Sequence, residues 1–440
     1  MSFPGGLSPQ AWLDAHVNME TGVGVPAPTR ERGAPTLERI GTLLQYLGSP
    51  QLEFPAIHLT GTNGKTTATR MIAELLSTVG YSTGAYTSPH LQRVNERIVW
   101  NGEPISDREL AEQLHSVALV EQELGLDPSY FEVVTGAAMS WFADVAVDVA
   151  VIEVGLGGTW DATNVVDADI AVVTNVALDH TQWLGETVAK IASEKAGIVK
   201  KGSTLVLGET DPELGALFTD REPARVLRRD IDFGTRSNVS AVGGRMLELF
   251  TPEGRYPEVF LPLYGAHQGD NAALALAAAE VFVGAALEPE AVYDAFTRVR
   301  SPARLEIVGR RPLVLLDGAH NAAGAEALRA ALAEEFAPAP RTLVIGLLRE
   351  RDPVEMLTAL GLDEVAQLVC ARPPSPRAMA PAVIAEAAVE LGFPAEHIEV
   401  VDTVAEAVSS ALLSTPAEGE IVVTGSLNFV GAARGILADS

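Results

Sequence analysis

The chain has 440 residues, of which 47% are apolar and 20% charged, so it favours two or three folded domains and argues against a disordered chain. Its formal net charge of −27 argues against nucleic acid or an anionic membrane as a partner, because clustered Lys and Arg bind such surfaces. A single cysteine, Cys370, leaves no internal disulfide, and neither a signal-like N-terminus nor an apolar stretch of spanning length is present, so we expect a soluble cytoplasmic protein.

The chain begins with a short amphipathic piece around Trp12 and a loop rich in glycine and proline from Gly22 to Pro35. A helix is predicted from Thr36 to Leu47. The loop precedes the most informative stretch of the sequence and could cover a ligand, although most such loops only connect elements.

That stretch begins with a buried-looking strand from Ala56 to Thr60, turns through Gly61 and Gly64, and enters a helix. It has the layout of a phosphate-binding loop, in which backbone N–H groups and the helix N-terminus attract an anion. Lys65 would reach the outer phosphates of a nucleotide, and the Thr66 hydroxyl would bind Mg²⁺. The first glycine comes later than in the general pattern, so the loop is a shortened variant. An ordinary turn with a solvated lysine is the less favoured reading, because every part falls in the required order.

Polar side chains follow three further strands of the predicted sheet. Ser88 comes after the strand from Tyr81 to Tyr86, Glu153 lies near the end of an apolar strand, and His180 follows a third. The carboxyl ends of parallel strands are where an open α/β sheet binds ligands. Burying an unpaired carboxylate is costly, so Glu153 should face a cation or the open end of the sheet. His180 suits a structural role and a ligand role equally well.

Helices are predicted over Asp107 to Leu124 and Phe131 to Val145, and another from Thr187 carries Lys195. Among apolar neighbours, the Lys195 amine could simply extend to solvent. Short β-like runs follow, and we expect a small appended sheet at about residues 203–263. Helices from His267 to Gly284, beginning near Asn271, and from Glu288 to Arg298 complete this half.

A domain boundary is predicted at Arg300–Arg304, beyond which strands and helices alternate as in a second, mostly parallel sheet. Asp317–Asn321 and Thr424–Ser426 follow two of its strands, at ligand-facing positions. The predicted fold is therefore α/β: a P-loop ATPase domain over residues 1–299, with a central mostly parallel sheet, and a Rossmann-like domain over residues 300–440.

Ten motifs in this order resemble the Mur-type ligases, and within them folylpolyglutamate synthase and dihydrofolate synthase, over nearly the whole chain. The phosphate loop is the superfamily motif. The folate-branch motifs are Ser88–Leu91 with Glu96–Ile98, Phe131–Glu132, Glu153–Gly158 with Asp161–Asn164, Leu178–His180, Glu194–Ile198, Gly265–Gln268 with Asn271, Ser301–Glu306, Asp317–Asn321 and Thr424–Ser426.

The resemblance implies an ATP-dependent amide ligase that adds L-glutamate to dihydropteroate, to folate polyglutamates or to both, through an acyl phosphate. It implies ATP, two Mg²⁺ ions and, as a further option, a monovalent cation, in a monomer whose site closes between the domains. The implied nucleotide-binding residues are Thr62, Asn63, Gly64, Lys65, Thr66, Asn271 at adenine, Arg304 at the phosphates and Asp317 at the ribose. The implied metal ligands are Thr66, Ser88, Glu153 and His180. The implied catalytic residues are Lys65, His180, His320 and Lys195 as a carbamate, and the substrate-binding residues are Phe131, Glu132, Asp161 and Ser426.

Some positions depart from the family pattern. Thr159 stands where arginine is frequent, Ala303 where glycine is frequent and Ala322 where proline is usual, and Arg349–Asp352 replaces a lysine-aspartate motif. Arginine is not a neutral replacement for lysine. Two alternatives stay open: a related ligase with another acceptor, such as a specialised pterin or a cell-wall precursor, and a nucleotide-binding module without catalysis.

Overall fold

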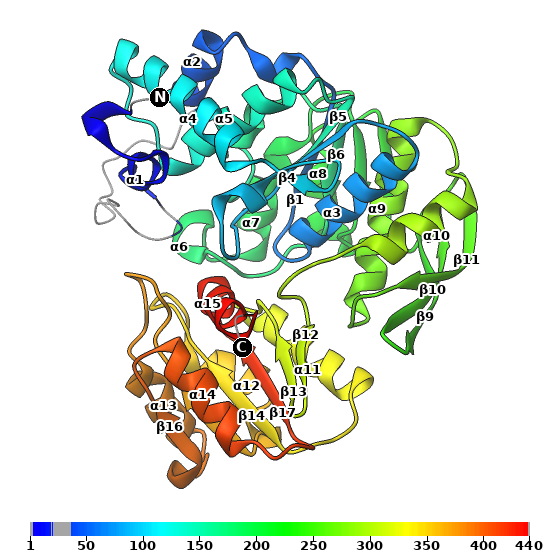
Figure 1. The fold of residues 1–440 in the computed structure, drawn as a ribbon. Helices are drawn as coiled ribbons and strands as arrows, with labels where there is room; N and C mark the ends of the chain where they lie inside the picture. The colour runs from blue at the N-terminus through cyan, green and yellow to red at the C-terminus, as the bar shows by residue number, and fades with distance from the viewer. Residues whose placement is uncertain (1–2, 19, 21–36, 439–440) are drawn as a thin grey trace. The chain divides into compact units, whose positions relative to one another are not determined.

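A computed structural model describes residues 3–18, 20 and 37–438 of the chain, so the predicted loop from Gly22 to Pro35 lies outside the described residues. The chain divides into two compact units (Figure 1). Unit 1 comprises Met1–Asn238, Met246–Pro262 and Gly269–Val299. Unit 2 comprises Val239–Arg245, Leu263–Gln268 and Arg300–Ser440.

Unit 1 is built on an eight-stranded sheet in the order β4-β3-β2-β5-β1-β6-β7-β8. Its strands are β1 (Ala56–Thr60), β2 (Thr83–Tyr86), β3 (Ile98–Trp100), β4 (Glu103–Pro104), β5 (Val149–Glu153), β6 (Ile170–Val173), β7 (Thr204–Leu207) and β8 (Arg225–Arg228). Its helices are α1 (Pro9–Asp14), α2 (Glu38–Tyr46), α3 (Lys65–Thr78), α4 (Asp107–Leu124), α5 (Tyr130–Asp144), α6 (Thr181–Leu184), α7 (Val188–Lys195), α8 (Pro212–Thr219) and α10 (Pro289–Arg298), and α9 (His267–Val283) lies mostly in this unit.

The strand order of unit 1 reverses at β1. From β1 the chain passes to β2, which lies beyond β5, and it later reaches β6 on the opposite side of β1. Because β2, β5, β1 and β6 are parallel, their carboxyl ends meet at one edge of the sheet. Loops that leave neighbouring strands in different directions open a crevice, which is where such sheets bind ligands.

The central strands are buried on both faces, which explains their continuous apolar sequences. One face packs against α4 and α5, whose buried residues include Leu114, Val133 and Phe142. Both helices begin with a capping box, Ser106 with Glu109 and Ser129 with Glu132, so their first turns are fixed by side-chain hydrogen bonds.

A separate three-stranded sheet contains β9 (Gly234–Ala241), β10 (Gly244–Phe250) and β11 (Arg255–Leu261). It is shorter than the range 203–263 expected for the small sheet. The strands β7 and β8 fall in that range, but they pair in parallel at the edge of the large sheet. Helix α8 connects them, so this stretch continues the β-α-β pattern of the larger sheet.

Unit 2 is built on a six-stranded sheet in the order β12-β13-β17-β14-β15-β16. Its strands are β12 (Glu306–Arg310), β13 (Leu313–Leu316), β14 (Arg341–Ile345), β15 (Gln367–Cys370), β16 (Ile398–Val400) and β17 (Glu420–Thr424). Its helices are α11 (Ala322–Glu335), α12 (Pro353–Ala359), α13 (Pro381–Glu390), α14 (Val404–Ser414) and α15 (Leu427–Ala438). All neighbouring strands are parallel except β12, which runs antiparallel to β13.

The predicted α/β class with mostly parallel sheets is confirmed. The antiparallel strands β3, β4 and β12 were not predicted, because short edge strands carry little periodicity. Among the described residues, no helix is both long enough and apolar enough to cross a membrane.

Candidate active site

The loop between β1 and α3 requires its two glycines. Gly61 has a φ of 151°, and a Cβ atom there would lie 1.8 Å from Thr174 Oγ1. Gly64 has a φ of 84° at the N-cap of α3, where a Cβ atom would lie 2.5 Å from Asn271 Oδ1. Both positions therefore combine a left-handed backbone with a close neighbour, which only glycine tolerates. Asn271, predicted at adenine, lies against this loop.

The end of β6 holds the loop in shape. The Asn63 N–H donates to Asn175 Oδ1 at 3.0 Å, and the Thr174 hydroxyl donates to the Asn63 carbonyl at 2.7 Å. The Thr62 N–H donates to the Asn175 carbonyl at 2.9 Å, and its hydroxyl donates to the Ala177 carbonyl. These bonds fix the backbone ahead of a 14-residue helix whose positive dipole end favours an anion.

Two lysine amines converge on one carbonyl of the loop. Lys65 Nζ lies 3.0 Å from the Gly61 oxygen, and Lys195 Nζ lies 2.7 Å from the same oxygen. Lys195 is only 4% exposed. Burial and the neighbouring charge of Lys65 lower the pKa of Lys195 from 10.5 to about 7. A substantial fraction of this amine is therefore neutral near pH 7, in contrast to an ordinary surface lysine.

A carboxylate lies beside the loop at the end of β5. Glu153 is 1% exposed, and the Thr66 hydroxyl lies 2.9 Å from both of its oxygens. The Ser88 N–H donates to Glu153 Oε2 at 3.2 Å. A carboxylate with an adjacent hydroxyl is a hard oxygen donor set of the kind Mg²⁺ prefers, so these residues fit the expected ion. No group of three or more His, Cys, Asp or Glu side chains suited to a metal occurs in the described part of the chain.

His180 lies at the start of α6 with a φ of 50°. Its Nε2 lies 3.8 Å from Asp179 Oδ1, and the side chain is 37% exposed. Nothing in this geometry tests its role as a metal ligand, which stays a prediction.

Phe131 and Asp161 both border the turn after β5. A Cβ atom on Gly155 would lie 2.6 Å from Cζ of Phe131, so the ring lies directly on the backbone of this turn. Asp161 accepts from the Leu156 N–H at 2.8 Å and from the Thr163 N–H at 3.0 Å. Burial raises the pKa of Asp161, and these bonds oppose the shift. Asp161 therefore stabilises the turn after β5 and caps the short 3₁₀ helix at Ala162–Val165. Its role in binding the substrate stays a prediction.

Glu132 lies in the first turn of α5, and its carboxylate is 8% exposed. It accepts from the Arg39 Nε and from the N–H and hydroxyl of Ser129. The predicted substrate role of this residue is likewise untested, but its oxygens already carry several donors.

In unit 2, the loop after β13 folds around its own backbone. Asp317 accepts from the Leu305 N–H at 3.0 Å and the Ala319 N–H at 2.9 Å, and burial raises its pKa although Arg304 opposes the shift. A Cβ atom on Gly318 would lie 2.3 Å from an Arg304 nitrogen, so the guanidinium lies on this loop. His320 Nδ1 lies 2.8 Å from the Gly318 carbonyl, which can only accept, so Nδ1 carries a proton.

Ser426 follows β17 at the same sheet edge of unit 2. The Gly425 N–H donates to the Ala319 carbonyl at 3.1 Å, which joins the two predicted ligand loops of this unit. Ser426 is 3% exposed, and its hydroxyl oxygen has no hydrogen-bond partner among the described residues.

Comparison with known proteins identifies the family. The model of the Mur ligase middle domain matches residues 59–279, and that of the Mur ligase glutamate ligase domain matches residues 303–427. The chain belongs to the Mur ligase family. This Mur ligase is 40% identical to the dihydrofolate synthase/folylpolyglutamate synthase of Mycobacterium tuberculosis, over 91% of this chain and 89% of that protein. It is 36% identical to the folylpolyglutamate synthase of Lacticaseibacillus casei, over 90% and 93% of the two chains.

Solved structures agree with this assignment. The M. tuberculosis folylpolyglutamate synthase complexed with ADP and AMPPCP matches this Mur ligase with a TM-score of 0.86 and 39% identity, over 92% of this chain and 95% of that one. An Escherichia coli protein, FolC in complex with DHPP and ADP, matches with a TM-score of 0.86 and 29% identity, over 98% of each chain. The predicted membership in the folylpolyglutamate synthase and dihydrofolate synthase group is confirmed.

Some polar groups of this Mur ligase were not predicted to matter. Thr174 and Asn175, which follow β6, hydrogen-bond to the phosphate loop. The sequence feature that could have predicted this contact is a pair of adjacent polar residues at the end of a buried strand. Arg97 was quoted only as part of a motif, yet its side chain is 1% exposed. A buried guanidinium requires a partner, and its ion pair with Glu20 cannot be read from the sequence because the two residues lie 77 positions apart.

The segment Arg349–Asp352 of this Mur ligase forms a turn that is stabilised by side-chain hydrogen bonds and an ion pair. Arg349 donates to the Pro376 carbonyl at 2.6 Å, Glu350 pairs with Arg377 at 2.8 Å, and Asp352 caps α12. The residues that replace the expected lysine-aspartate motif thus fix local structure.

Proposed function

We propose that this chain is an ATP-dependent ligase that joins L-glutamate to the carboxylate of a pteroate or folate. The observation that carries the proposal is the convergence of Lys65 and Lys195 on Gly61, beside Thr66 and the buried Glu153. The Lys65 ammonium and the N-terminus of α3 place positive charge at this loop in a chain of net charge −27, which suits anionic substrates.

The residues of the loop suit phosphoryl transfer to a carboxylate. The N–H groups at the start of α3 and the Lys65 ammonium would hold the phosphates of ATP and offset their repulsion with the acceptor carboxylate. Thr66 would hold one Mg²⁺, and Ser88, Glu153 and His180 would hold a second; the bound ions would neutralise charge that develops on the phosphate oxygens. A monovalent cation belongs to the same proposal.

Lys195 is proposed to act as a carbamate. Its neutral amine nitrogen would attack CO₂, form an N–C bond and release a proton, which gives an anionic group near the loop. The pKa of about 7 supports this step, because only the neutral amine has the electron pair to donate. Burial and the charge of Lys65 together supply that neutral amine.

The acyl phosphate formed from the acceptor would then react with the amine of glutamate. The attack forms the amide bond, and phosphate leaves with the electron pair of the broken C–O bond. His320 is proposed to take the proton that the amine loses, because its Nδ1 proton is committed to Gly318 and its Nε2 is the basic nitrogen. Ser426 is proposed to bind glutamate, Arg304 the phosphates, Asp317 the ribose and Asn271 the adenine. Phe131, Glu132 and Asp161 are the proposed acceptor residues.

Release of phosphate from ATP tests the proposal. We expect release only when a folate or dihydropteroate and L-glutamate are both present, with a ligated product one glutamate heavier by mass spectrometry. Parallel rates with dihydropteroate and with tetrahydrofolate would define the acceptor. Phosphate release with another acid alone would instead support the related-ligase alternative, and no release with any acceptor would support a nucleotide-binding module.

A monomeric state and a cytoplasmic location complete the proposal. Sedimentation of the purified chain with and without nucleotide tests the first. Cell fractionation tests the second.

A further inference from the structure

Two ion pairs meet at the start of α5, and of their four residues the proposed chemistry uses only Glu132. The helix begins with Ser129 as N-cap, and Tyr130, Phe131 and Glu132 form its first turn. Arg97 lies over the ring of Tyr130, with its guanidinium carbon 5.4 Å from the ring centroid. Arg39 binds Glu132. Phe131, the residue on the Gly155 turn, lies between these two fixed neighbours.

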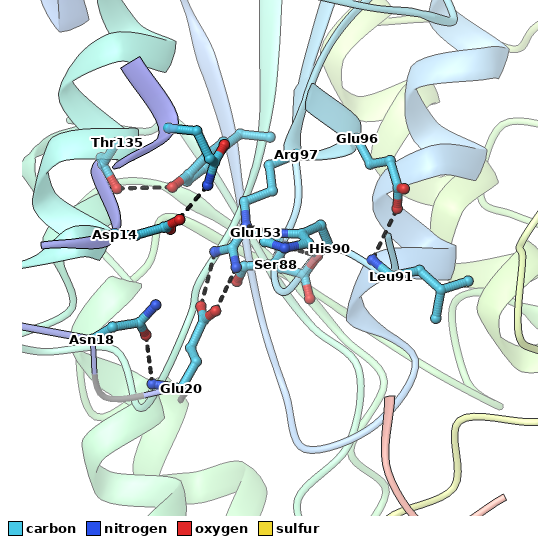
Figure 2. A network of polar contacts seen from close by, with 12 residues as sticks. Asp14, Asn18, Glu20, Ser88, His90, Leu91, Glu96, Arg97, Thr135 and Glu153 are labelled. Atoms are coloured by element: carbon cyan, nitrogen blue, oxygen red, sulfur yellow. Dashed lines mark hydrogen bonds and ion pairs between the residues drawn. The ribbon is translucent and has the colours of Figure 1, made fainter. Parts of the chain in front are cut away.

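The first pair joins Arg97 to Glu20. Arg97 is 1% exposed and binds both oxygens of Glu20, one of them at 2.9 Å. Figure 2 shows the Arg97 guanidinium between Glu20 and His90, with Ser88 and Glu153 beside them. Such two-point pairing with a carboxylate fixes orientation as well as charge. A single-point cation such as lysine would lose that geometry.

Arg97 also holds the turn that carries Ser88. Its Nε donates to His90 Nδ1 at 2.8 Å, and its backbone carbonyl accepts from the Thr87 N–H at 2.9 Å. A guanidinium can only donate, so His90 Nδ1 is the acceptor of this bond. Both ends of the turn are thus bound to one residue, and Ser88 between them donates to Glu153.

The second pair joins Arg39, in α2, to Glu132. Arg39 Nε lies 3.0 and 2.9 Å from the two Glu132 oxygens, and one terminal nitrogen lies 2.5 Å from Oε2. The same Oε2 accepts from the Ser129 N–H and hydroxyl at 2.8 and 2.7 Å. The carboxylate therefore locks the N-cap and the third residue of α5 to another helix.

We propose that the Glu20–Arg97 and Arg39–Glu132 pairs are positioning elements for the acceptor substrate. They fix the first turn of α5, and with it the Phe131 ring on Gly155, while Arg97 also holds Ser88 beside Glu153. The inference rests on the proposed function, since Phe131 is the proposed acceptor contact. Glu132 would then act as a positioning residue through Arg39 and Ser129, in place of the direct acceptor contact. Small misplacements of a bound group carry large rate costs, which gives such bracing a function.

Four conservative variants test the inference: Glu20→Gln, Arg97→Lys, Arg39→Lys and Glu132→Gln. We expect each to raise the KM for the acceptor by about tenfold, while the KM for ATP changes by less than about twofold in the Arg39→Lys and Glu132→Gln variants, whose ion pair does not hold Ser88. The matched controls are Arg93→Lys and Asp107→Asn, an exposed ion pair on the same stretch, with side chains 64% and 74% exposed. These should leave both constants unchanged. Equal increases in both KM values of the Arg39→Lys and Glu132→Gln variants, or unchanged acceptor KM values in the four variants, would overturn the inference.

Hydrogen exchange supplies a readout that needs no acceptor. Amides of residues 87–91 and 129–134 should exchange faster in the Arg97→Lys variant, and those of 129–134 in the Glu132→Gln variant, whereas the amides of α13 should not change. Exchange rates at residues 87–91 and 129–134 that equal those of the wild type in these variants would contradict the proposed positioning role of the ion pairs. If Arg97→Lys fails to fold, Glu20→Gln tests the same pair from its more exposed side. Wild-type protein without folate-dependent phosphate release would refute the proposed function, while the exchange result would still decide the bracing.

Discussion

The two strand-end sites differ in how their polar groups are satisfied. In unit 1, residues of β5, of the loops after β1 and β6 and of helices α3 and α7 bind one another: Asn63 to Asn175, Thr66 to Glu153 and Lys195 to Gly61. In unit 2, His320 binds the backbone of its own loop, and the Ser426 hydroxyl is buried without a partner among the described residues. Burying an unpaired hydroxyl costs free energy. The difference supports the proposals that unit 1 binds phosphate in a preformed loop and that the Ser426 hydroxyl is paired by a group of the ligand.

The largest expected effect comes from removing the buried lysine of the preformed site. Lys195→Ala should lower kcat by about a thousandfold, because it removes a charge placed for the transition state, while ATP binding stays nearly unchanged. Phosphate-release assays and calorimetry with ATP measure the two quantities. Lys201→Ala, at an exposed lysine nearby, is the control and should behave as wild type. A variant with wild-type turnover would remove Lys195 from the mechanism.

Glu153→Gln keeps the shape of the side chain and removes its charge. We expect about a hundredfold lower kcat and a higher Mg²⁺ concentration for half-maximal activity, because the hard oxygen donor is weakened. A titration of activity with Mg²⁺ measures both. Glu222→Gln, at an exposed carboxylate, should shift neither. An unchanged Mg²⁺ requirement would place the ion elsewhere.

Ser426→Ala sharpens the contrast between the two sites. It should raise the KM for glutamate by about tenfold, the worth of one hydrogen bond to a charged group, and leave the free energy of unfolding unchanged or higher. Steady-state kinetics and urea denaturation measure the two effects.

A matched hydroxyl pair in unit 2 provides the comparison. Thr415→Val removes one partner of the buried Thr342–Thr415 bond of 2.7 Å, so it should cost about 1 kcal/mol of unfolding free energy without changing the KM for glutamate. Equal destabilisation by the two variants would show that Ser426 is paired in the free protein.

The smallest effect is that of pH on Lys195. With a pKa of about 7, half of the amines are neutral at that pH and nearly all are neutral one to two units above it. The initial rate at which the carbamate signal grows in ¹³C NMR with labelled bicarbonate should therefore rise by about twofold from pH 7 to pH 8.5 at constant dissolved CO₂. The Lys195→Ala variant should lack the signal. A carbamate signal that appears only above pH 10 would mean that the pKa of the Lys195 amine is not lowered.

Local patterns accounted for much of the phosphate site, whereas contacts across the sheet did not follow from the sequence. The order of strand, glycines, lysine and threonine lies within a dozen residues, so the loop around Lys65 could be predicted with its helix. Glu20 and Arg97 lie 77 residues apart, and no period or motif joins them. The edge strand β12 reads as a linker, because antiparallel pairing with β13 gives it little burial of its own. Asp161 and Glu132 were recognised as important residues, but their hydrogen bonds to neighbouring backbone groups depend on turn geometry that the sequence does not reveal.

Lys65 and Lys195 are far apart in the sequence, but both amines lie within hydrogen-bonding distance of the Gly61 oxygen, so the charge of one affects the other. Since the charge on Lys65 helps to keep Lys195 unprotonated, neutralising residue 65 would raise the proton affinity of residue 195 and reduce the capture of CO₂ that we propose for it. A substitution at Lys65 would thus damage two functions at once, and bubbling the assay with extra carbon dioxide would restore only the second.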